Sequence, residues 1–242
     1  MPSRPSTHQY QAASVPRSHT GRVVDDLGLS IVSGRQQQGS LLPGDSELIE
    51  RYGVSRTVLR EALKTLSAKG LVQAKARIGT RVRERADWNF FDPDVLIWHA
   101  RNGFTPEFLS HLGEMRLALE SEAASLAAIR RTPAQLEAIW GHVYRMSVPE
   151  IAPQEFVRAD LGLHLAIAEA AGNPFFLSIS TLIEVALVAM LTVSSPVENA
   201  ERLAQSVKQH RAIAEAIEAR DPDTARAAMR AVVQKGIDRT KS

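Results

Sequence analysis

The chain has 242 residues, of which 44% are apolar and 23% charged, and its formal net charge is +2. This length predicts two domains, since one domain usually takes roughly 100–200 residues. The sequence contains no cysteine, which excludes disulfide bonds and Cys-ligated zinc or iron–sulfur sites. No apolar run approaches the roughly 20 residues of a membrane-spanning helix, so we expect a cytoplasmic protein without a membrane partner.

The small net charge hides an uneven distribution. Residues 1–85 contain 14 Lys and Arg against 7 Asp and Glu, whereas residues 86–242 contain 15 against 20. A basic half suits a module that faces phosphates, and an acidic half suits one that does not touch DNA. This charge distribution supports DNA binding only if a DNA-binding motif lies in the basic half.

The first 20 residues are rich in Ser, Pro, Gln and His and poor in apolar residues, which is typical of a disordered tail. Arg4, Arg17 and Arg22 leave open that this segment is an arm that touches DNA. The apolar spacing that follows predicts a first helix from Arg22 to Ser33, ended by Gly34.

The segment from Leu42 to Val82 has helix-capping and helix-ending residues at the positions typical of a winged helix-turn-helix. Gly44 stands at the N-cap position of a short helix over roughly Asp45–Arg51, and Gly53 is suited to end that helix. Ser55 then stands as the N-cap of a second helix. Two helices joined by a tight glycine turn predict a helix-turn-helix.

The second helix has two faces of different character. Arg56 and Arg60 lie four residues apart with Thr57 beside them, away from the face that carries the apolar residues. Exposed arginines are most often only solvated surface. Here the order of elements favours DNA contact instead, because recognition helices contact bases through their N-terminal residues. The apolar residues are Val58, Ala62, Leu63 and Leu66.

A basic hairpin follows the second helix. Gly70 ends the helix, a strand begins at Leu71, and a turn at Arg77–Gly79 leads into a second strand at Thr80–Val82. A basic hairpin tip in this position is typical of a wing. Residues 21–85 are therefore predicted to form a winged helix-turn-helix domain with a small β wing.

Residues 86–93 are predicted to be a linker, with Trp88, Phe90 and Phe91 anchoring it against one of the domains. Residues 94–242 are predicted to be an all-α helical bundle, so the fold class is mainly α. A proline, a capping residue or both introduce each expected helix. The expected helices are Asp94–Asn102, Pro106–Arg131, Pro133–Ser147, Pro153–Ala171, Pro174–Ser194, Val197–Arg220 and Pro222–Gly236.

Three polar residues of the predicted bundle suit a metal site. Asp160 and His164 are four residues apart and can present a carboxylate and an imidazole on one helix face, and His210 lies on a later helix. A histidine on a mixed helix is more often a structural or surface residue. Spacing alone leaves both interpretations open.

Two stretches of the sequence resemble known domains. LPGDSELIERYGVSRTVLREALKTLSAKGLV resembles the DNA-binding domain of the GntR family of bacterial transcription regulators, with Gly44 where the family usually has Ser. DLGLHLAIAEAAGNPFF and QHRAIAEAIEARDPDTARAAMRAVV resemble the helical effector domain of the FadR subfamily, the FCD domain. The resemblance implies a homodimer on a palindromic double-stranded operator. The residues expected to contact DNA are Ser46, Ser55, Arg56, Thr57, Arg60, Arg77 and Gly79.

The resemblance also implies a divalent metal, such as Zn, Ni or Mn, held by one Asp and three His. Asp160, His164 and His210 fall on three of these positions, but Val232 stands where the last His is expected. Two alternatives follow. Either three ligands hold a metal whose shell solvent or effector completes, or the metal is lost and the polar residues bind the effector directly.

The resemblance implies an organic acid as effector, because Arg116 stands where the subfamily has an arginine that faces the cavity. A guanidinium binds a carboxylate through two parallel hydrogen bonds. The alternative for Arg116 is an intrahelical pair with Glu120 at the surface. Effector binding is therefore expected at Arg116, Asp160, His164 and His210. ADWNFFDPDVLIW resembles the galactonate-responsive regulators, which suggests an aldonate.

We therefore expect a ligand-responsive transcription regulator, a repressor of a sugar-acid or organic-acid catabolic operon, and not an enzyme. The alternative is a metal-dependent enzyme built on Asp160, His164 and His210, with an accessory N-terminal domain. A hydrolytic metal site also needs a positioned base near the metal-bound water. No segment of the sequence indicates such a base.

Overall fold

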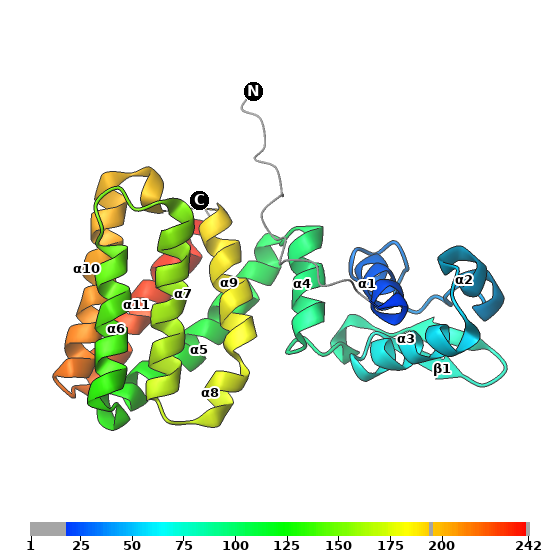
Figure 1. The fold of residues 1–242 in the computed structure, drawn as a ribbon, viewed down its shortest axis with the longest axis horizontal. Helices are drawn as coiled ribbons and strands as arrows, with labels where there is room; N and C mark the ends of the chain where they lie inside the picture. The colour runs from blue at the N-terminus through cyan, green and yellow to red at the C-terminus, as the bar shows by residue number, and fades with distance from the viewer. Residues whose placement is uncertain (1–17, 194–195, 241–242) are drawn as a thin grey trace. The chain divides into compact units, whose positions relative to one another are not determined.

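The structure, a computed structural model, describes residues 18–193 and 196–240 (Figure 1). The chain divides into two compact units, with the boundary between Asn102 and Gly103. The predicted tail lies mostly outside the described residues, as does Ser194 at the end of one predicted helix. The described part of the tail is helical, because the Ser18 side chain accepts a hydrogen bond from the Gly21 N–H and begins the first helix at His19.

The N-terminal unit is a helix-turn-helix with a two-stranded wing, as predicted. The strands pair antiparallel, with Val72 opposite Val82 and Lys75 opposite Gly79. Helix α1 packs against both α3 and α4. The elements are α1 (His19–Val32), α2 (Asp45–Tyr52), α3 (Arg56–Ala68), β1 (Val72–Lys75), β2 (Gly79–Val82), a short 3₁₀ turn (Arg85–Asp87) and α4 (Pro93–Asn102).

Local chemistry sets the ends of the two central helices. Gly53 adopts φ 61° after α2, a left-handed conformation that glycine takes without steric cost. The Ser55 side chain accepts a hydrogen bond from the Val58 N–H and caps α3. Leu59 and Leu66 of α3 are fully buried in the unit's core. The cap and the buried leucines together orient the opposite face of α3 toward solvent.

The predicted boundary at residues 86–93 is wrong, because α4 belongs to the N-terminal unit. Trp98 of α4 is 1% exposed, and its indole N–H donates to Asp25 of α1 over 2.9 Å. Lys69, which follows α3, pairs with Asp92 and Asp94 at the start of α4. The sequence predicted a helix at Asp94–Asn102, but the spacing of its apolar residues does not show which domain this helix packs on.

Two of the three aromatic residues expected to anchor this segment do so. Trp88 is buried, and Phe90 packs beside it with His99 of α4 against both rings. Phe91 is 57% exposed, so it anchors nothing within this unit. The expected anchoring therefore holds for Trp88 and Phe90 alone.

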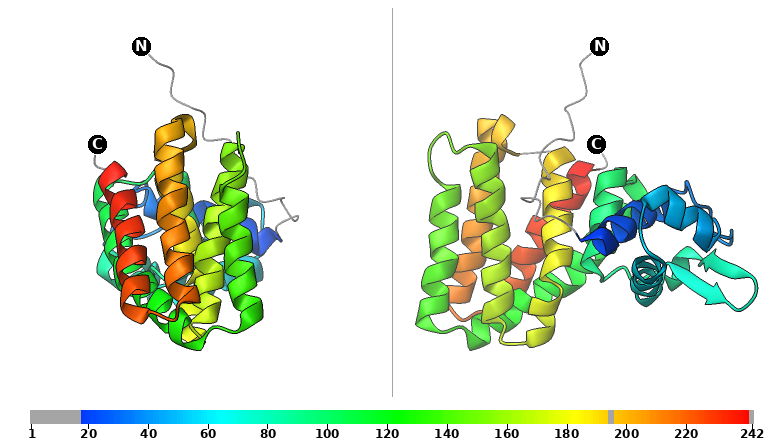
Figure 2. Two further views of the ribbon diagram at one scale, coloured as in Figure 1. Left: turned by 90° about the vertical axis from the view of Figure 1, so that its left-hand side faces the viewer. Right: turned by 45° about the vertical axis from the view of Figure 1, so that its right-hand side comes forward.

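The C-terminal unit is all-helical in its described residues, as predicted. Helix α5 packs along α11, α6 packs along α7, and α10 lies between α6 and α11 (Figures 1 and 2). Its elements are α5 (Pro106–Arg130), α6 (Pro133–Met146), α7 (Pro153–Ala170), α8 (Pro174–Ser178), α9 (Ser180–Val193), a 3₁₀ turn (Pro196–Glu198), α10 (Ala200–Glu218) and α11 (Pro222–Thr240).

Two helix predictions in this unit need correction. The single helix expected from Pro174 is broken at Ile179 into α8 and α9. The helix expected from Val197 begins only at Ala200, because the Asn199 side chain accepts a hydrogen bond from the Arg202 N–H and caps it there. No helix in the described part of the chain is both long and apolar enough to cross a membrane.

Candidate functional site

All residues predicted to contact DNA are solvent-exposed on the N-terminal unit. Five of them lie on α2, α3 or the cap between these helices, and two lie at the wing; the seven are Ser46, Ser55, Arg56, Thr57, Arg60, Arg77 and Gly79. The Arg60 side chain is 71% exposed, and its nearest acid is Glu61 at 4.0 Å. Glu61 in turn binds Lys64 at 2.9 Å. Arg60 is thus only weakly engaged within its own helix.

The wing tip has an unusual backbone. Arg77 adopts φ 62°, a conformation that residues other than glycine rarely take. It belongs to the three-residue turn between the paired residues Lys75 and Gly79, and all three residues of that turn are exposed. Residues in such rarely populated backbone conformations are frequent at functional sites. The turn presents the Arg77 guanidinium at the end of the hairpin.

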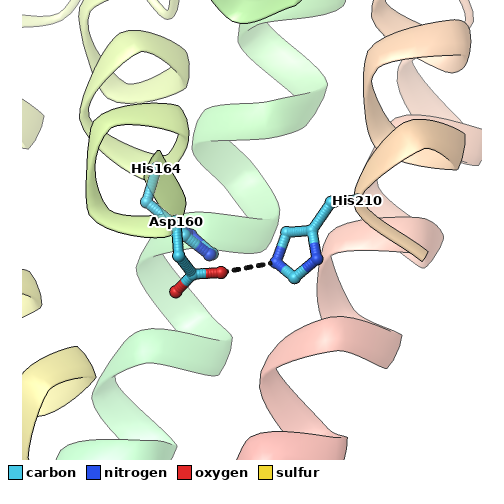
Figure 3. Close-up of side chains that lie close together, drawn as sticks. All are labelled: Asp160, His164 and His210. Atoms are coloured by element: carbon cyan, nitrogen blue, oxygen red, sulfur yellow. Dashed lines mark ion pairs between the residues drawn. The ribbon is translucent and has the colours of Figure 1, made fainter. Parts of the chain in front are cut away.

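The C-terminal unit brings Asp160 and His164 of α7 together with His210 of α10 (Figure 3). One potential ligand atom from each residue lies within 4.8 Å of the other two. Asp160 Oδ1 is 2.9 Å from His210 Nε2. All three residues are buried. The predicted trio therefore forms one cluster in the interior of the bundle.

A hydrogen bond at Nδ1 fixes the orientation of the His210 ring. His210 Nδ1 lies 2.7 Å from the backbone oxygen of Ser206. A carbonyl oxygen can only accept, so Nδ1 carries a proton, and Nε2 is the ring nitrogen that faces Asp160. A metal-binding histidine is commonly held in this way, with the second nitrogen donating to a carbonyl.

Four atoms of the cluster are buried without a hydrogen-bond partner: Asp160 Oδ2, His164 Nδ1, His164 Nε2 and His210 Nε2. Two of them still have an acidic neighbour, because His164 Nδ1 contacts Glu120 and His210 Nε2 lies 2.9 Å from Asp160 Oδ1. Buried polar atoms are normally satisfied, so an orphaned group of this kind indicates a missing ligand. One carboxylate and two imidazoles are donors that zinc and other divalent metals accept. The residues present therefore fit a divalent metal with three protein ligands.

Val232 of α11 lines the same cavity, in line with its expected position at the fourth ligand site. The valine side chain has no atom that could bind a metal. The space between the side chains is small, about 20 Å³, which holds about one water-sized group. Five further residues line it that the sequence did not single out: Phe156, Leu187, Ser206, Gly236 and Arg239.

Arg116 also lines this cavity, but it is paired with Glu120. Arg116 Nε lies 2.5 Å from Glu120 Oε1, and Nη2 lies 3.2 Å from Oε2. The intrahelical pair considered from the sequence thus exists, but both side chains are 3% exposed rather than at the surface. Glu120 Oε2 in turn contacts His164 Nδ1.

Glu120 is a further residue of this site whose role sequence reasoning missed. It appeared in the sequence only as a partner for Arg116, because nothing local shows that α5 turns this face toward α7. Burial would raise the pKa of Glu120, but the Arg116 guanidinium and His164 outweigh it and lower the pKa to about 2. Glu120 is therefore an ionised carboxylate that holds one side of His164.

Asp160 is ionised for a similar reason. Burial raises the pKa of this carboxyl group, whereas His210 and, to a smaller extent, His164 and Arg116 lower it, with a net result of about 2. Two buried carboxylates thus lie beside two histidines. This arrangement places anionic oxygen atoms beside imidazole nitrogen atoms, without a competing proton on Asp160.

Comparisons with known proteins match each of the two units to a known protein family. Residues 19–82 match the model of the bacterial regulatory proteins of the gntR family, and residues 111–235 match the FCD domain. The galactonate operon transcriptional repressor of Escherichia coli K12 is 32% identical over 92% of this chain and 96% of that protein. The HTH-type transcriptional repressor NanR of Cronobacter sakazakii is 36% identical over 78% of this chain and 72% of that protein.

A solved structure has the same fold. Lar, which controls the expression of the Listeria monocytogenes agr system, superposes with a TM-score of 0.60 at 18% identity, covering 93% of this chain and 97% of its own. The matched families and relatives are transcription regulators, so the alternative of a metal-dependent enzyme is not supported. The chain belongs to the gntR family of bacterial regulatory proteins and is a DNA-binding transcription regulator with an FCD domain.

Proposed function

We propose that this protein is a homodimeric repressor of a sugar-acid catabolic operon and that an aldonate such as galactonate releases it from its operator. The observation that carries the effector half of the proposal is the buried cluster of Asp160, His164 and His210, whose unpartnered atoms call for a ligand. The similarity to the galactonate operon repressor supports the class of effector. Since operator DNA is its target, its place of action is the cytoplasm.

On DNA, the two recognition helices α3 of the dimer enter successive major grooves of a palindromic operator, one helical turn apart. Arg56 and Arg60 contact bases and phosphates from the exposed face of α3, with Ser55 and Thr57 at the helix start. Ser46 of α2 and the wing residues Arg77 and Gly79 contact the backbone. The exposure of all these residues and the weak engagement of Arg60 support this assignment.

In the effector domain, Asp160, His164 and His210 would hold a divalent metal such as Zn, Ni or Mn. When bound, the metal would supply a Lewis-acidic position for the oxygen atoms of an organic acid. Val232 leaves the side toward α11 without a protein ligand. Glu120 holds His164, and the Ser206 carbonyl holds His210, so both rings are oriented in advance.

Effector binding must change the effector domain. The cavity has room for about one water-sized group, so its walls have to move to admit a sugar acid. Leu187 of α9 forms one wall. A ligand shifts an equilibrium by its differential affinity for the two states, and a coupling of about 1–3 kcal/mol between effector and operator is typical.

The DNA assignment is tested by a gel-shift titration on the promoter of the neighbouring operon. Arg60→Ala should abolish operator binding while leaving the dimer folded, whereas Arg230→Gln, at an exposed position of α11, should bind as the wild type does. Size-exclusion chromatography with light scattering reports the dimer in both variants. Unchanged binding by Arg60→Ala would contradict the DNA assignment.

The metal assignment is tested by measuring metal content after equilibration with divalent ions. The wild type should carry one metal per chain and His164→Ala should carry none, with the exposed His111→Ala as the matched control. A wild type without stoichiometric metal would favour the alternative in which the polar residues bind the effector directly.

A further inference from the structure

We propose that two copies of this chain pair through the outer face formed by α6 and α10 of the C-terminal unit, with their α10 helices antiparallel. This inference rests on the proposed function, because it assigns a surface to the proposed homodimer. In the left view of Figure 2, α10 lies at the front of this unit, between α11 and α6. The residues that define this α6–α10 face are Trp140, Tyr144, Glu201, Ala204, Lys208 and Arg211.

A surface hollow of about 430 Å³ lies on the α6–α10 face, between the end of α6 and the N-terminal half of α10. Its apolar lining includes Val148, which is 51% exposed, and the partly buried Leu203 and Val207. Lys208 and Arg211, which are both exposed, line it as well. Exposed apolar surface that is bordered by charged residues is typical of a protein–protein interaction site.

An aromatic platform adjoins this hollow. The rings of Trp140 and Tyr144 stack with their centroids 5.6 Å apart, and the Arg211 guanidinium lies 5.7 Å from the centre of the Trp140 ring. Tyr144 is nevertheless 59% exposed. Trp, Tyr and Arg are the residues that most often dominate the binding energy of interfaces. Because stacking already orients these three side chains, little conformational entropy is lost when a partner binds them.

The charges of α10 select a second copy as the partner. Glu201 and Lys208 are both exposed and are seven residues apart, close to two helical turns, so they lie on one side of α10. In an antiparallel pair of α10 helices whose two-fold axis passes between Ala204 and Gln205, Glu201 faces the partner's Lys208. By symmetry, Lys208 faces the partner's Glu201. The face is therefore complementary in charge to itself, as a two-fold symmetric interface requires.

The antiparallel arrangement is favoured over a parallel one. A parallel pair would place Glu201 beside the partner's Glu201, and like charges that face each other are unfavourable. Ala204 is exposed and lies next to the axis. Its small side chain lets the two helices approach to the roughly 8–10 Å at which helices pack.

The same helix connects this surface with the buried polar cluster. Glu201 and His210 are nine residues apart, or two and a half turns, so they lie on opposite sides of α10. His210 is buried beside Asp160, whereas Glu201 is exposed. A ligand that shifts α10 therefore also changes the surface that meets the second copy.

The test measures the dissociation constant of the full-chain homodimer by sedimentation. Glu201→Lys and Lys208→Glu each turn two attractive contacts into two repulsive ones, so each variant alone should raise the dissociation constant about 10- to 100-fold. An equal mixture of the two variants should form a heterodimer as tightly as the wild type pairs, because each contact then joins a lysine to a glutamate. Ala204→Trp should also weaken the homodimer, since it blocks the approach of the helices.

Arg230→Glu is the matched control. It makes the same change of charge as Lys208→Glu, at an exposed position of α11. It should dimerise as the wild type does. Thermal unfolding followed by circular dichroism should give the same melting temperature for the wild type and for all these variants, which shows that they fold.

The outcomes separate this inference from the proposed function. A wild type that is monomeric at every concentration would overturn both this inference and the proposed homodimer. A dimeric wild type whose affinity is unchanged in Glu201→Lys and Lys208→Glu would overturn the inference alone, as would weakened variants that do not recover when mixed. Recovered heterodimers that bind operator DNA no better than the separate variants would support the inference and contradict the proposed dimeric mode of DNA binding.

Discussion

Trp98 of α4 lies directly on Gly28 of α1, so closely that a Cβ atom at position 28 would fall 2.3 Å from the Cη2 atom of the indole ring. The indole N–H also donates to Asp25, one turn earlier on α1. Arg101 of α4 pairs with the same carboxylate at 2.7 Å. These contacts make α4 a structural part of the DNA-binding unit.

Gly28→Ala should destabilise the N-terminal unit. Alanine is favoured over glycine inside a helix by about 1 kcal/mol, but the clash with Trp98 forces a displacement whose cost is typically about 1–3 kcal/mol. Thermal unfolding followed by tryptophan fluorescence should show a lower melting temperature. Gly141→Ala in α6 is the control with the opposite sign, because nothing lies within 4 Å of a Cβ atom there. A stabilised Gly28→Ala protein would contradict the close packing.

Arg77→Gly should weaken operator binding without unfolding the wing. Glycine adopts the observed φ of 62° without strain, so the hairpin is preserved. Loss of one phosphate contact should reduce the slope of log K against log salt concentration by about 1. Fluorescence anisotropy with labelled operator at several salt concentrations measures this slope. An unchanged slope would show that the wing tip does not touch the DNA.

Arg116→Met should destabilise the effector domain strongly. Removing one partner of a buried ion pair leaves an uncompensated charge, which costs about 3–5 kcal/mol, and here that charge is Glu120. The double variant Arg116→Met with Glu120→Leu removes both charges and should recover most of the loss. Chemical denaturation of the four proteins of this cycle gives the coupling. Additive losses would mean that the pair contributes little.

His99 should make the stability of the DNA-binding unit depend on pH. Burial lowers the pKa of His99 below its usual 6.5, and Arg85 lowers it further against the opposing effect of the Val95 carbonyl. Because the folded-state pKa lies below the unfolded-state pKa, the stabilisation is complete above about pH 6.5 and is lost as the pH falls through the folded-state pKa.

The variant His99→Phe retains a ring against Trp88 and Phe90 but cannot be protonated. Melting temperatures measured between pH 7.5 and 5 should fall less steeply for this variant than for the wild type. Parallel curves would exclude His99 as the source of the pH dependence.

Much of the DNA-binding unit was predictable from the sequence because its signals are local. Gly53 and Ser55 act on their own helix ends, and the hairpin turn is set by a few consecutive residues. The same holds for the starts of α5, α6 and α7, each introduced by a proline. Such features need no knowledge of distant parts of the chain.

The predictions that failed concern contacts between segments far apart in the sequence. Whether α4 packs on α1 depends on the fit of Trp98 over Gly28, 70 residues away. The burial of Arg116 and Glu120 depends on how α5 meets α7, and the break at Ile179 depends on packing that overrides a continuous apolar pattern.

The sequence by itself determined the order of the helices, the helix-turn-helix with its wing, and the three residues that form the buried polar cluster. Only the tertiary structure decided which domain holds α4, which arginine is committed to a buried carboxylate, and that Arg239 reaches the cavity. The physical reason is that caps, turns and helical periodicity act over a few residues, whereas burial and charge pairing depend on which surfaces meet when the chain folds.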